Sequence, residues 1–195
     1  MHTVRVLLIA IGGLLAFPIS VAMTQTQGGG HRFEVSTFVG LATADGTDFN
    51  GTKDASGFAA AVRYVLRGHL GLAAGVQYSD HGLQSFPEHL HIRALYGEFR
   101  YIAPLGGSAV SLFAGLRGGP IHEGITIVNW TANGWAAGGL GGVDWHVLPP
   151  LALEFQVSES TIHLGDRRGA DGSVIAGTKV RGSSFGLGGG VVFWF

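Results

Sequence analysis

The stretch Gly186–Phe195, GLGGGVVFWF, closes the sequence and decides how the rest of it is interpreted. Counted back from the last residue, its alternate positions are all apolar or glycine: Phe195, Phe193, Val191, Gly189 and Leu187. Successive side chains of a β-strand point to opposite faces, so this pattern predicts a strand with one apolar face. Such a strand at a chain end is expected to pair within a sheet, because an unpaired terminus usually frays in solvent.

The same alternation recurs along the chain between turn-rich stretches, and no segment after residue 30 shows a helical period. We predict eight strands, at residues 31–42, 56–66, 69–79, 90–102, 109–118, 134–147, 151–159 and 182–195. Their connections alternate between short turns (66–69, 103–108, 147–150) and long polar loops (43–55, 80–89, 119–133, 160–181). This is the pattern of an up-and-down meander with both ends of the chain on the short-turn side.

Each predicted strand has one apolar face, whereas the other face carries the charges. The charged face holds Arg32, Glu34, Arg63, Glu98, Arg100, Arg117, Asp144 and Glu154, among many of the 34 glycines. A soluble barrel would bury its apolar face, but here the opposite face is too charged to form a dry core. The apolar face is therefore expected to contact lipid, where only a closed barrel pairs every backbone group. The predicted fold is all-β: an eight-stranded antiparallel up-and-down transmembrane β-barrel.

Aromatic residues on the apolar face gather at the two ends of the strands, as they do at the two interfaces of membrane barrels. The short-turn ends carry Phe33, Tyr64, Tyr101 and Trp145, and the long-loop ends carry Tyr78 and Trp135. Arg93 is the one charge predicted on the apolar face. It lies near a long-loop end, where it is expected to meet lipid phosphates; the alternative is a snorkelling or misassigned residue.

The front of the chain has the composition of a secretory signal. A basic Arg5 precedes the apolar run Val6–Ala16, and Ser20–Ala22 supplies small residues for cleavage. A membrane anchor is the alternative, although the run is short for a spanning helix. We therefore predict a signal peptide over 1–22, a polar lead-in over 23–30 and a barrel domain over 31–195. A net charge of −1 gives no basic surface for nucleic acid, and the absence of cysteine excludes disulfides.

Three motifs resemble the small eight-stranded outer-membrane barrels of the OmpA-transmembrane, OmpX and opacity-protein kind. They are LYGEFRY at 95–101, GGVDWH at 141–146 with the following PPLALEF at 149–155, and the terminal ladder. The resemblance implies a Gram-negative outer membrane containing lipopolysaccharide, with periplasmic termini and extracellular long loops. It also implies delivery by periplasmic chaperones and insertion by the barrel-assembly machinery, with Phe195, Phe193 and Val191 as the assembly signal. A monomer without cofactor is expected.

The inward charges are expected to fill the lumen as a salt-bridge network, because open channels belong to barrels with more strands. Catalysis by a His-x-Ser arrangement, as in lipid-modifying barrels, is not expected, because Gln77 stands where Ser79 would need its base. No catalytic residue is therefore predicted.

Histidines offer the remaining chemistry. His89 and His91, with His81 nearby, have a spacing that suits a metal ion, but solvated loop histidines are the favoured explanation and no metal is predicted. The pairs His122–Glu123 and His163 with Asp166 are weaker candidates.

The loops are the expected seat of specific interactions, notably the charged stretch 166–172 and the alternating stretch 125–130. The predicted function is a structural or surface-interaction role without enzymatic activity. A narrow channel for small solutes or ions is the alternative, and a lipid-modifying enzyme is the third hypothesis.

Overall fold

The computed structural model describes residues 31–45, 54–83, 89–106, 108–126 and 128–195, so the predicted signal peptide and lead-in lie outside the described residues. Within these ranges, no helix is long and apolar enough to cross a membrane. The strands are β1 (Arg32–Asp45), β2 (Ala55–Leu66), β3 (Leu70–Gly82), β4 (His89–Pro104), β5 (Val110–Ile125), β6 (Trp130–Leu148), β7 (Leu151–Leu164), β8 (Arg167–Arg168), β9 (Val174–Ile175) and β10 (Val180–Trp194).

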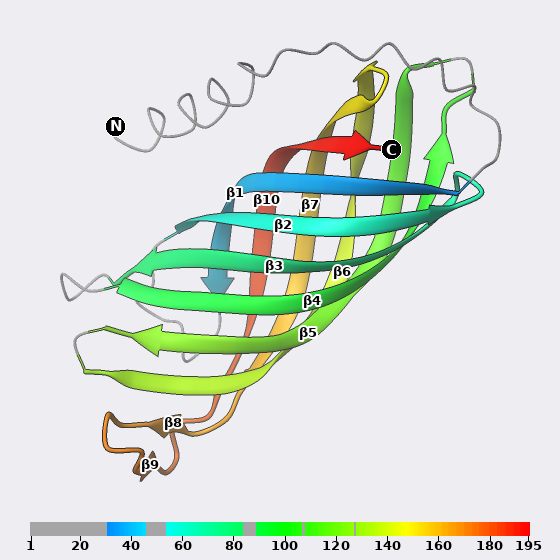
Figure 1. Ribbon diagram of the computed structural model, residues 1–195. Coiled ribbons are helices and arrows are strands. Elements are labelled where there is room, and N and C mark those ends of the chain that lie inside the picture. The colour runs from blue at the N-terminus through cyan, green and yellow to red at the C-terminus, as the bar shows by residue number, and fades with distance from the viewer. Residues whose placement is uncertain (1–30, 46–53, 84–88, 107, 127) are drawn as a thin grey trace.

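Eight long strands form a closed antiparallel barrel, as the sequence predicts. Each strand pairs with its neighbours along the chain, β5 pairs with β6, and β10 pairs with both β7 and β1. Pairing of β1 with β10 closes the ring, and this removes the two free edges that an open sheet would have. The short strands β8 and β9 form a small hairpin between β7 and β10, beyond one end of the barrel (Figure 1).

The strands tilt strongly around the barrel (Figure 1). Following directly paired residues from Leu151 on β7 once around the ring leads to Thr161, ten residues further along the same strand. Such an offset requires the strands to be inclined to the barrel axis. Side chains that are neighbours in the ladder therefore lie at different heights in the wall.

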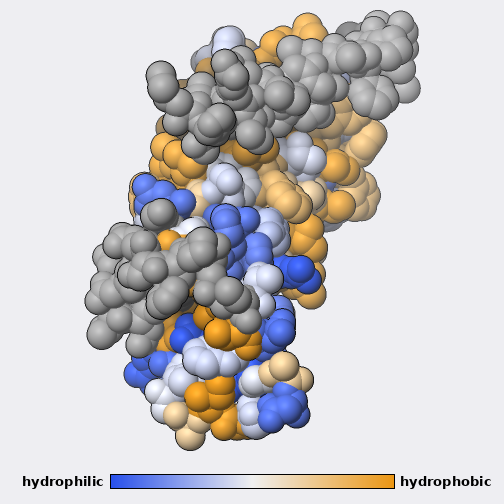
Figure 2. Space-filling view, turned by 90° about the vertical axis from the view of Figure 1, so that its left-hand side faces the viewer, coloured by the Kyte–Doolittle hydropathy of each residue, from blue (hydrophilic) through white to orange (hydrophobic). Residues whose placement is uncertain are grey.

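The outer wall is apolar and the interior is charged, which confirms the predicted assignment of faces. Leu72 and Leu116 are 50% and 67% exposed, although both lie within paired strands of the barrel. The alternate positions point inward and are buried, among them Glu34, Arg63 and Glu154. Figure 2 shows mainly apolar side chains over the upper part of one face and a mixture of hydrophilic and apolar ones over its lower part, toward the end that carries β8 and β9.

Two of the predicted long loops are wrong in extent. Most of 119–133 is strand, because β5 runs to Ile125 and β6 begins at Trp130, and β7 runs to Leu164. The stretch 125–130 thus lies at the tip of a hairpin that extends beyond the apolar band. In this extension the alternation is inverted: Leu90 and Ile121 point inward and are buried, while the alternating His91 and His122 lie on the opposite face.

Glycines in the lumen leave room for large side chains, as expected. A Cβ atom on Gly71 would lie 3.0 Å from both Arg100 Cγ and Arg63 Cδ. A Cβ atom on Gly75 would lie 2.5 Å from Cζ of Tyr96. These strands carry glycine because arginine and tyrosine side chains occupy the space in front of them.

Candidate functional site

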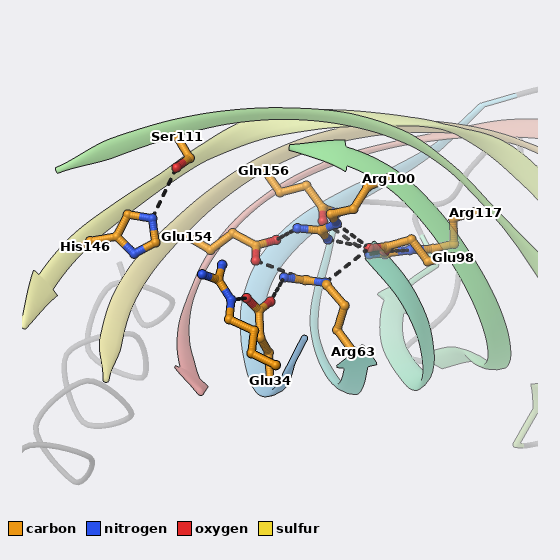
Figure 3. Close-up of polar contacts among 10 residues, drawn as sticks. Glu34, Arg63, Glu98, Arg100, Ser111, Arg117, His146, Glu154 and Gln156 are labelled. Atoms are coloured by element: carbon orange, nitrogen blue, oxygen red, sulfur yellow. Dashed lines mark hydrogen bonds and ion pairs between the residues drawn. The ribbon is translucent and has the colours of Figure 1, made fainter. Parts of the chain in front are cut away.

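Arg63 lies at the centre of a buried ionic network inside the barrel (Figure 3). Its Nη1 donates to Glu34 Oε2 at 2.7 Å, and its Nη2 donates to Glu154 Oε2 at 3.2 Å. Its Nε lies 3.9 Å from Oε1 of Glu98. These acids come from β1, β7 and β4, so the guanidinium from β2 links four strands of the barrel.

Glu98 accepts hydrogen bonds from two further inward arginines, Arg100 and Arg117. Arg100 donates to its Oε1 at 2.5 Å and also to Glu154 Oε1 at 2.9 Å. Arg117 donates to its Oε2 through both Nε and Nη2. Arg32, at the rim of the network, donates to Glu34 Oε1 at 2.7 Å. Four arginines and three glutamates thus share one network, which suits buried charges because each is stabilised only when paired and hydrogen-bonded.

Asp144 is the predicted member that the network does not include. It is buried and in register with Glu154, but it forms no ion pair with another described residue, and its Oδ1 has no hydrogen-bond partner there. The neighbouring guanidinium of Arg63 is already occupied by Glu34 and Glu154. His146, a further candidate in this region, makes a hydrogen bond with Ser111 at 3.2 Å instead of joining the acids.

Two aromatic members of the lumen packing, Tyr96 and Phe113, were missed from the sequence, whereas Gln156 was placed on the inward face. Gln156 accepts from Arg117 Nη2 at 3.2 Å. The guanidinium carbon of Arg117 lies 4.2 Å from the ring centre of Tyr96, and that of Arg100 lies 4.1 Å from the ring centre of Phe113. The available signal was the alternation of side chains, since Tyr96 and Phe113 alternate with lipid-facing residues as the inward acids do.

An apolar cluster fills the lumen at the end that carries β8 and β9. Its buried members are Leu90, Ile121, Ala132, Ile162, Leu164 and Val180. Glu123 is buried beside it and pairs with Arg167 from β8, whose Nε donates to Glu123 Oε1 at 3.0 Å. Burial raises the pKa of the Glu123 carboxyl, and the nearby Arg167 offsets part of this effect. The sequence prediction of a polar lumen is therefore wrong at this end.

The histidines do not converge on a metal. His81 points into the barrel and is buried, whereas His89 and His91 lie on the outer wall. Within the described part of the chain, no three histidine, cysteine or acidic side chains are placed to hold a metal ion. The hydroxyl of Ser79 lies 3.1 Å from His81 Nε2, a contact that was missed from the sequence because the base was sought at Gln77. Both residues are buried, which separates them from any substrate at the surface.

The other weak candidates also stay apart. His122 Nδ1 lies 2.8 Å from Asn133 Oδ1, while Glu123 faces the opposite side of the strand. His163 stacks on Trp135 with ring centres 4.3 Å apart. The carboxylate of Asp166 accepts from the backbone N–H of Gly177 at 3.1 Å.

The predicted girdle residues lie on the outer wall. Phe33, Tyr101, Trp135 and Trp145 are each at least half exposed, and Phe33 packs against Tyr64 at 4.9 Å between ring centres. Phe193 and Phe195 lie on the same wall, and the N–H of Phe195 donates to the carbonyl of Phe33 at 3.0 Å. Val191 pairs with Thr37. Their role as an assembly signal remains a prediction.

Among the residues that the structure describes, two charges, and not one, face outward from the apolar part of the wall. Arg93 is exposed and in register with Tyr78. Glu159 is also exposed and lies between Gly139 and Phe185 in the ladder. Glu159 was missed from the sequence because the seventh strand was expected to end there.

Comparison with solved structures identifies the fold. No protein-family model matches the chain, and no curated protein does. The structure resembles Neisserial surface protein A (NspA), with a TM-score of 0.60 and 16% identity over 84% of this chain and 96% of that one. It also resembles a major outer membrane protein from Thermus thermophilus (TM-score 0.53, 14% identity, 85% and 100% coverage) and OprG from Pseudomonas aeruginosa (0.51, 18%, 87% and 99%).

The fold is that of a small outer-membrane β-barrel. The resemblance predicted from the three sequence motifs is thus confirmed at the level of architecture. The barrel also has the surface that a membrane requires: an apolar band with aromatic residues at both ends. At this level of identity the likeness assigns no activity, so function has to be argued from the residues of this chain.

Proposed function

We propose that this outer-membrane barrel has no catalytic activity and acts as a structural or surface-interaction protein through the outer ends of its strands. The packing of the lumen carries this proposal. Arginine–glutamate pairs fill its centre and apolar side chains fill its outer end. Neither layer suits the passage of a hydrated solute, so the exposed strand extensions and the β8–β9 hairpin are the surfaces left for interaction.

Conductance across a planar bilayer distinguishes this function from a narrow channel. We expect the reconstituted protein to show no stepwise currents, while a sixteen-stranded porin in the same bilayer reports that the assay works. Reproducible unitary currents would favour the channel. The mass spectrum of lipid A from cells with and without the protein tests the enzymatic alternative, and we expect identical spectra.

We also propose that β8 and β9 face the outside of the cell and that the short turns face the periplasm. The chain has no cysteine, so single cysteines report orientation without background. Ala170 in the β8–β9 hairpin and Gly106 in a short turn are both exposed. Ala170→Cys is expected to react with an impermeant maleimide in intact cells, and Gly106→Cys only after the outer membrane is permeabilised. The opposite result would invert the orientation.

A further inference from the structure

The β8–β9 hairpin, residues 165–179 between β7 and β10, is attached to the barrel at few points (Figure 1). Among the described residues, its one ladder pair with a barrel strand joins Arg168 to Thr131 on β6. Beside this pair, the N–H of Gly165 donates to the carbonyl of Asn133 at 2.9 Å. Because local stability follows the contacts that a segment makes, the hairpin can leave the barrel while the eight long strands stay closed.

The side chain of Arg167 ties the hairpin to the mouth of the barrel. Its Nε and Nη2 lie 3.0 and 2.8 Å from Oε1 of Glu123 on β5. Successive strand residues point to opposite faces, so Arg167 turns toward the lumen while its neighbour Arg168 is exposed on the outer face. The side chains of Arg167 and Glu123 are only 18% and 1% exposed. This ion pair therefore links β8 to a barrel strand other than β6, its ladder partner.

Glu123 is a carboxylate whose surroundings favour the neutral acid. Its ladder neighbours, Ile92 on β4 and Ala132 on β6, do not titrate. Its Oε2 is buried and has no hydrogen-bond partner in the part of the chain that the structure describes. Burial raises the pKa of the carboxyl, and Arg167 offsets only part of this effect. The anion is therefore maintained by a guanidinium that belongs to the hairpin.

Two histidines are the other described titratable groups near this carboxyl, and both belong to barrel strands. His122 faces the outer side of β5, and its charged form would favour the anion. His81 on β3 points into this end of the lumen. The strands β7 and β10 contribute the apolar Leu164 and Val180 here. When the hairpin moves, these groups stay with the barrel, whereas Arg167 is withdrawn from the carboxylate.

We propose that the Arg167–Glu123 pair is an acid-sensitive latch, which keeps the hairpin docked at the mouth of the barrel and releases it when Glu123 takes up a proton. A neutral carboxyl no longer pairs with the guanidinium, and a partly buried cation without an anion is stabilised by moving into water. The barrel strands that bury Glu123 stay in place, so withdrawal of Arg167 favours the neutral acid further. Protonation and release therefore reinforce each other. The inference goes beyond the proposed function, because it concerns the position of the hairpin and not what binds there.

The test places one spin label on the hairpin at Ala170 and one at Ser56, which is exposed on β2 at the opposite side of the ring from β6. The chain has no cysteine, so Ala170→Cys and Ser56→Cys are labelled selectively. Pulsed electron–electron double resonance on the full barrel in lipid vesicles should give one narrow distance population at pH 7.5. A second, broader population should grow as the pH falls to 4.5, while circular dichroism shows that the barrel stays folded. The distance is the same in either orientation, so the proposed orientation can fail without affecting this result.

Three variants separate the latch from a general effect of acid. Glu123→Gln should shift the ratio of docked to free hairpin at least about tenfold toward the free form at pH 7.5 and abolish the pH response. Arg167→Gln changes a residue outside the barrel wall, so the barrel should fold normally, and the hairpin should again be free. Arg168→Gln, the matched control on the opposite face of β8, should stay docked at pH 7.5 and keep the pH response. A hairpin that stays docked at pH 7.5 in Glu123→Gln or Arg167→Gln, an equal effect of Arg168→Gln, or a wild type that does not respond to pH would each overturn the proposal.

Discussion

The guanidinium of Arg63 on β2 reaches the carboxylate of Glu154 on β7 at 3.2 Å, although β1 and β10 lie between these strands in the sheet. This contact crosses the lumen instead of running along the wall. It connects the first strands of the chain to the last ones, so the two halves of the barrel are held from the inside as well as by the β1–β10 ladder. Both side chains are buried, so water does not screen the pair.

Removing the charge of Glu154 is therefore expected to be costly. Glu154→Gln leaves Arg63 and Arg100 with one anionic partner fewer each, and breaking one side of a buried ion pair typically costs about 3–5 kcal/mol. The free energy of unfolding in lipid vesicles, measured by urea titration, should fall by about that amount.

Glu159 provides a matched control on the same strand. Its side chain points to lipid between Gly139 and Phe185 and forms no ion pair with another described residue. Glu159→Gln removes a charge from the apolar wall, so stability should be unchanged or higher. Equal destabilisation by the two substitutions would show that the ionic network adds nothing to the barrel.

The architecture could be predicted from the sequence because one rule, the alternation of side chains, acts along every strand. Phe193 and Leu72 face lipid, and Glu98 and Arg100 face inward, as the alternation of side chains predicts. The ends of the strands were harder to predict, because beyond the apolar band the inward-facing side chains are apolar and the outward-facing ones are polar. His122 was interpreted as a loop residue, although it lies on the outer face of a strand whose inner face holds Ile121.

The partners within the lumen could not be predicted, because parity gives the side of a residue but not its neighbour across the barrel. Asp144 has the parity of the network and is buried, yet its neighbours pair with other acids. The contact of Arg117 with Tyr96 depends on the tilt of the strands, because the tilt decides which residues of different strands lie at the same height in the lumen. Contacts of this kind follow from three-dimensional geometry that no local pattern encodes.

The assignment of faces can be tested with two neighbouring positions. Leu72→Phe enlarges a side chain that faces fluid lipid and should leave the folding yield in vesicles nearly unchanged. Ala73→Phe places the same ring in the lumen, in register with Arg63 and Glu98, where overpacking typically costs about 1–3 kcal/mol. A damaging Leu72→Phe with a neutral Ala73→Phe would contradict the lipid-facing parity.

Glycines on the two faces should respond differently to alanine. At Gly75 a new Cβ would lie 2.5 Å from Tyr96 Cζ and 2.6 Å from the Ala60 carbonyl oxygen, so Gly75→Ala should destabilise the barrel by about 1–3 kcal/mol. At Gly97, on the lipid face, the nearest atom beyond its chain neighbours would be 4.0 Å away. Gly97→Ala should be neutral or stabilising, since alanine restricts the unfolded chain. Urea titration of both variants checks the difference.

The buried carboxyl of Glu123 should make stability depend on pH in the direction opposite to that of an ordinary ion pair. It lies beyond Pro120, whose cross-strand partner Trp135 belongs to the aromatic ring, so it is outside the apolar band. Burial raises its pKa above the ordinary value near 4.5, and Arg167 only partly compensates. When the folded pKa of an acid exceeds the unfolded one, ionisation at neutral pH costs stability, and the cost disappears as pH falls to the unfolded pKa.

Glu123→Gln removes this cost. We expect its thermal unfolding midpoint to exceed that of the wild type at pH 7.5 and the difference to vanish near pH 4.5. Arg167→Gln removes the compensating charge, so this variant should be less stable than the wild type at pH 7.5 and recover on acidification. A Glu123→Gln variant that is less stable than the wild type at pH 7.5 would mean that the Arg167 ion pair outweighs the burial of the carboxyl.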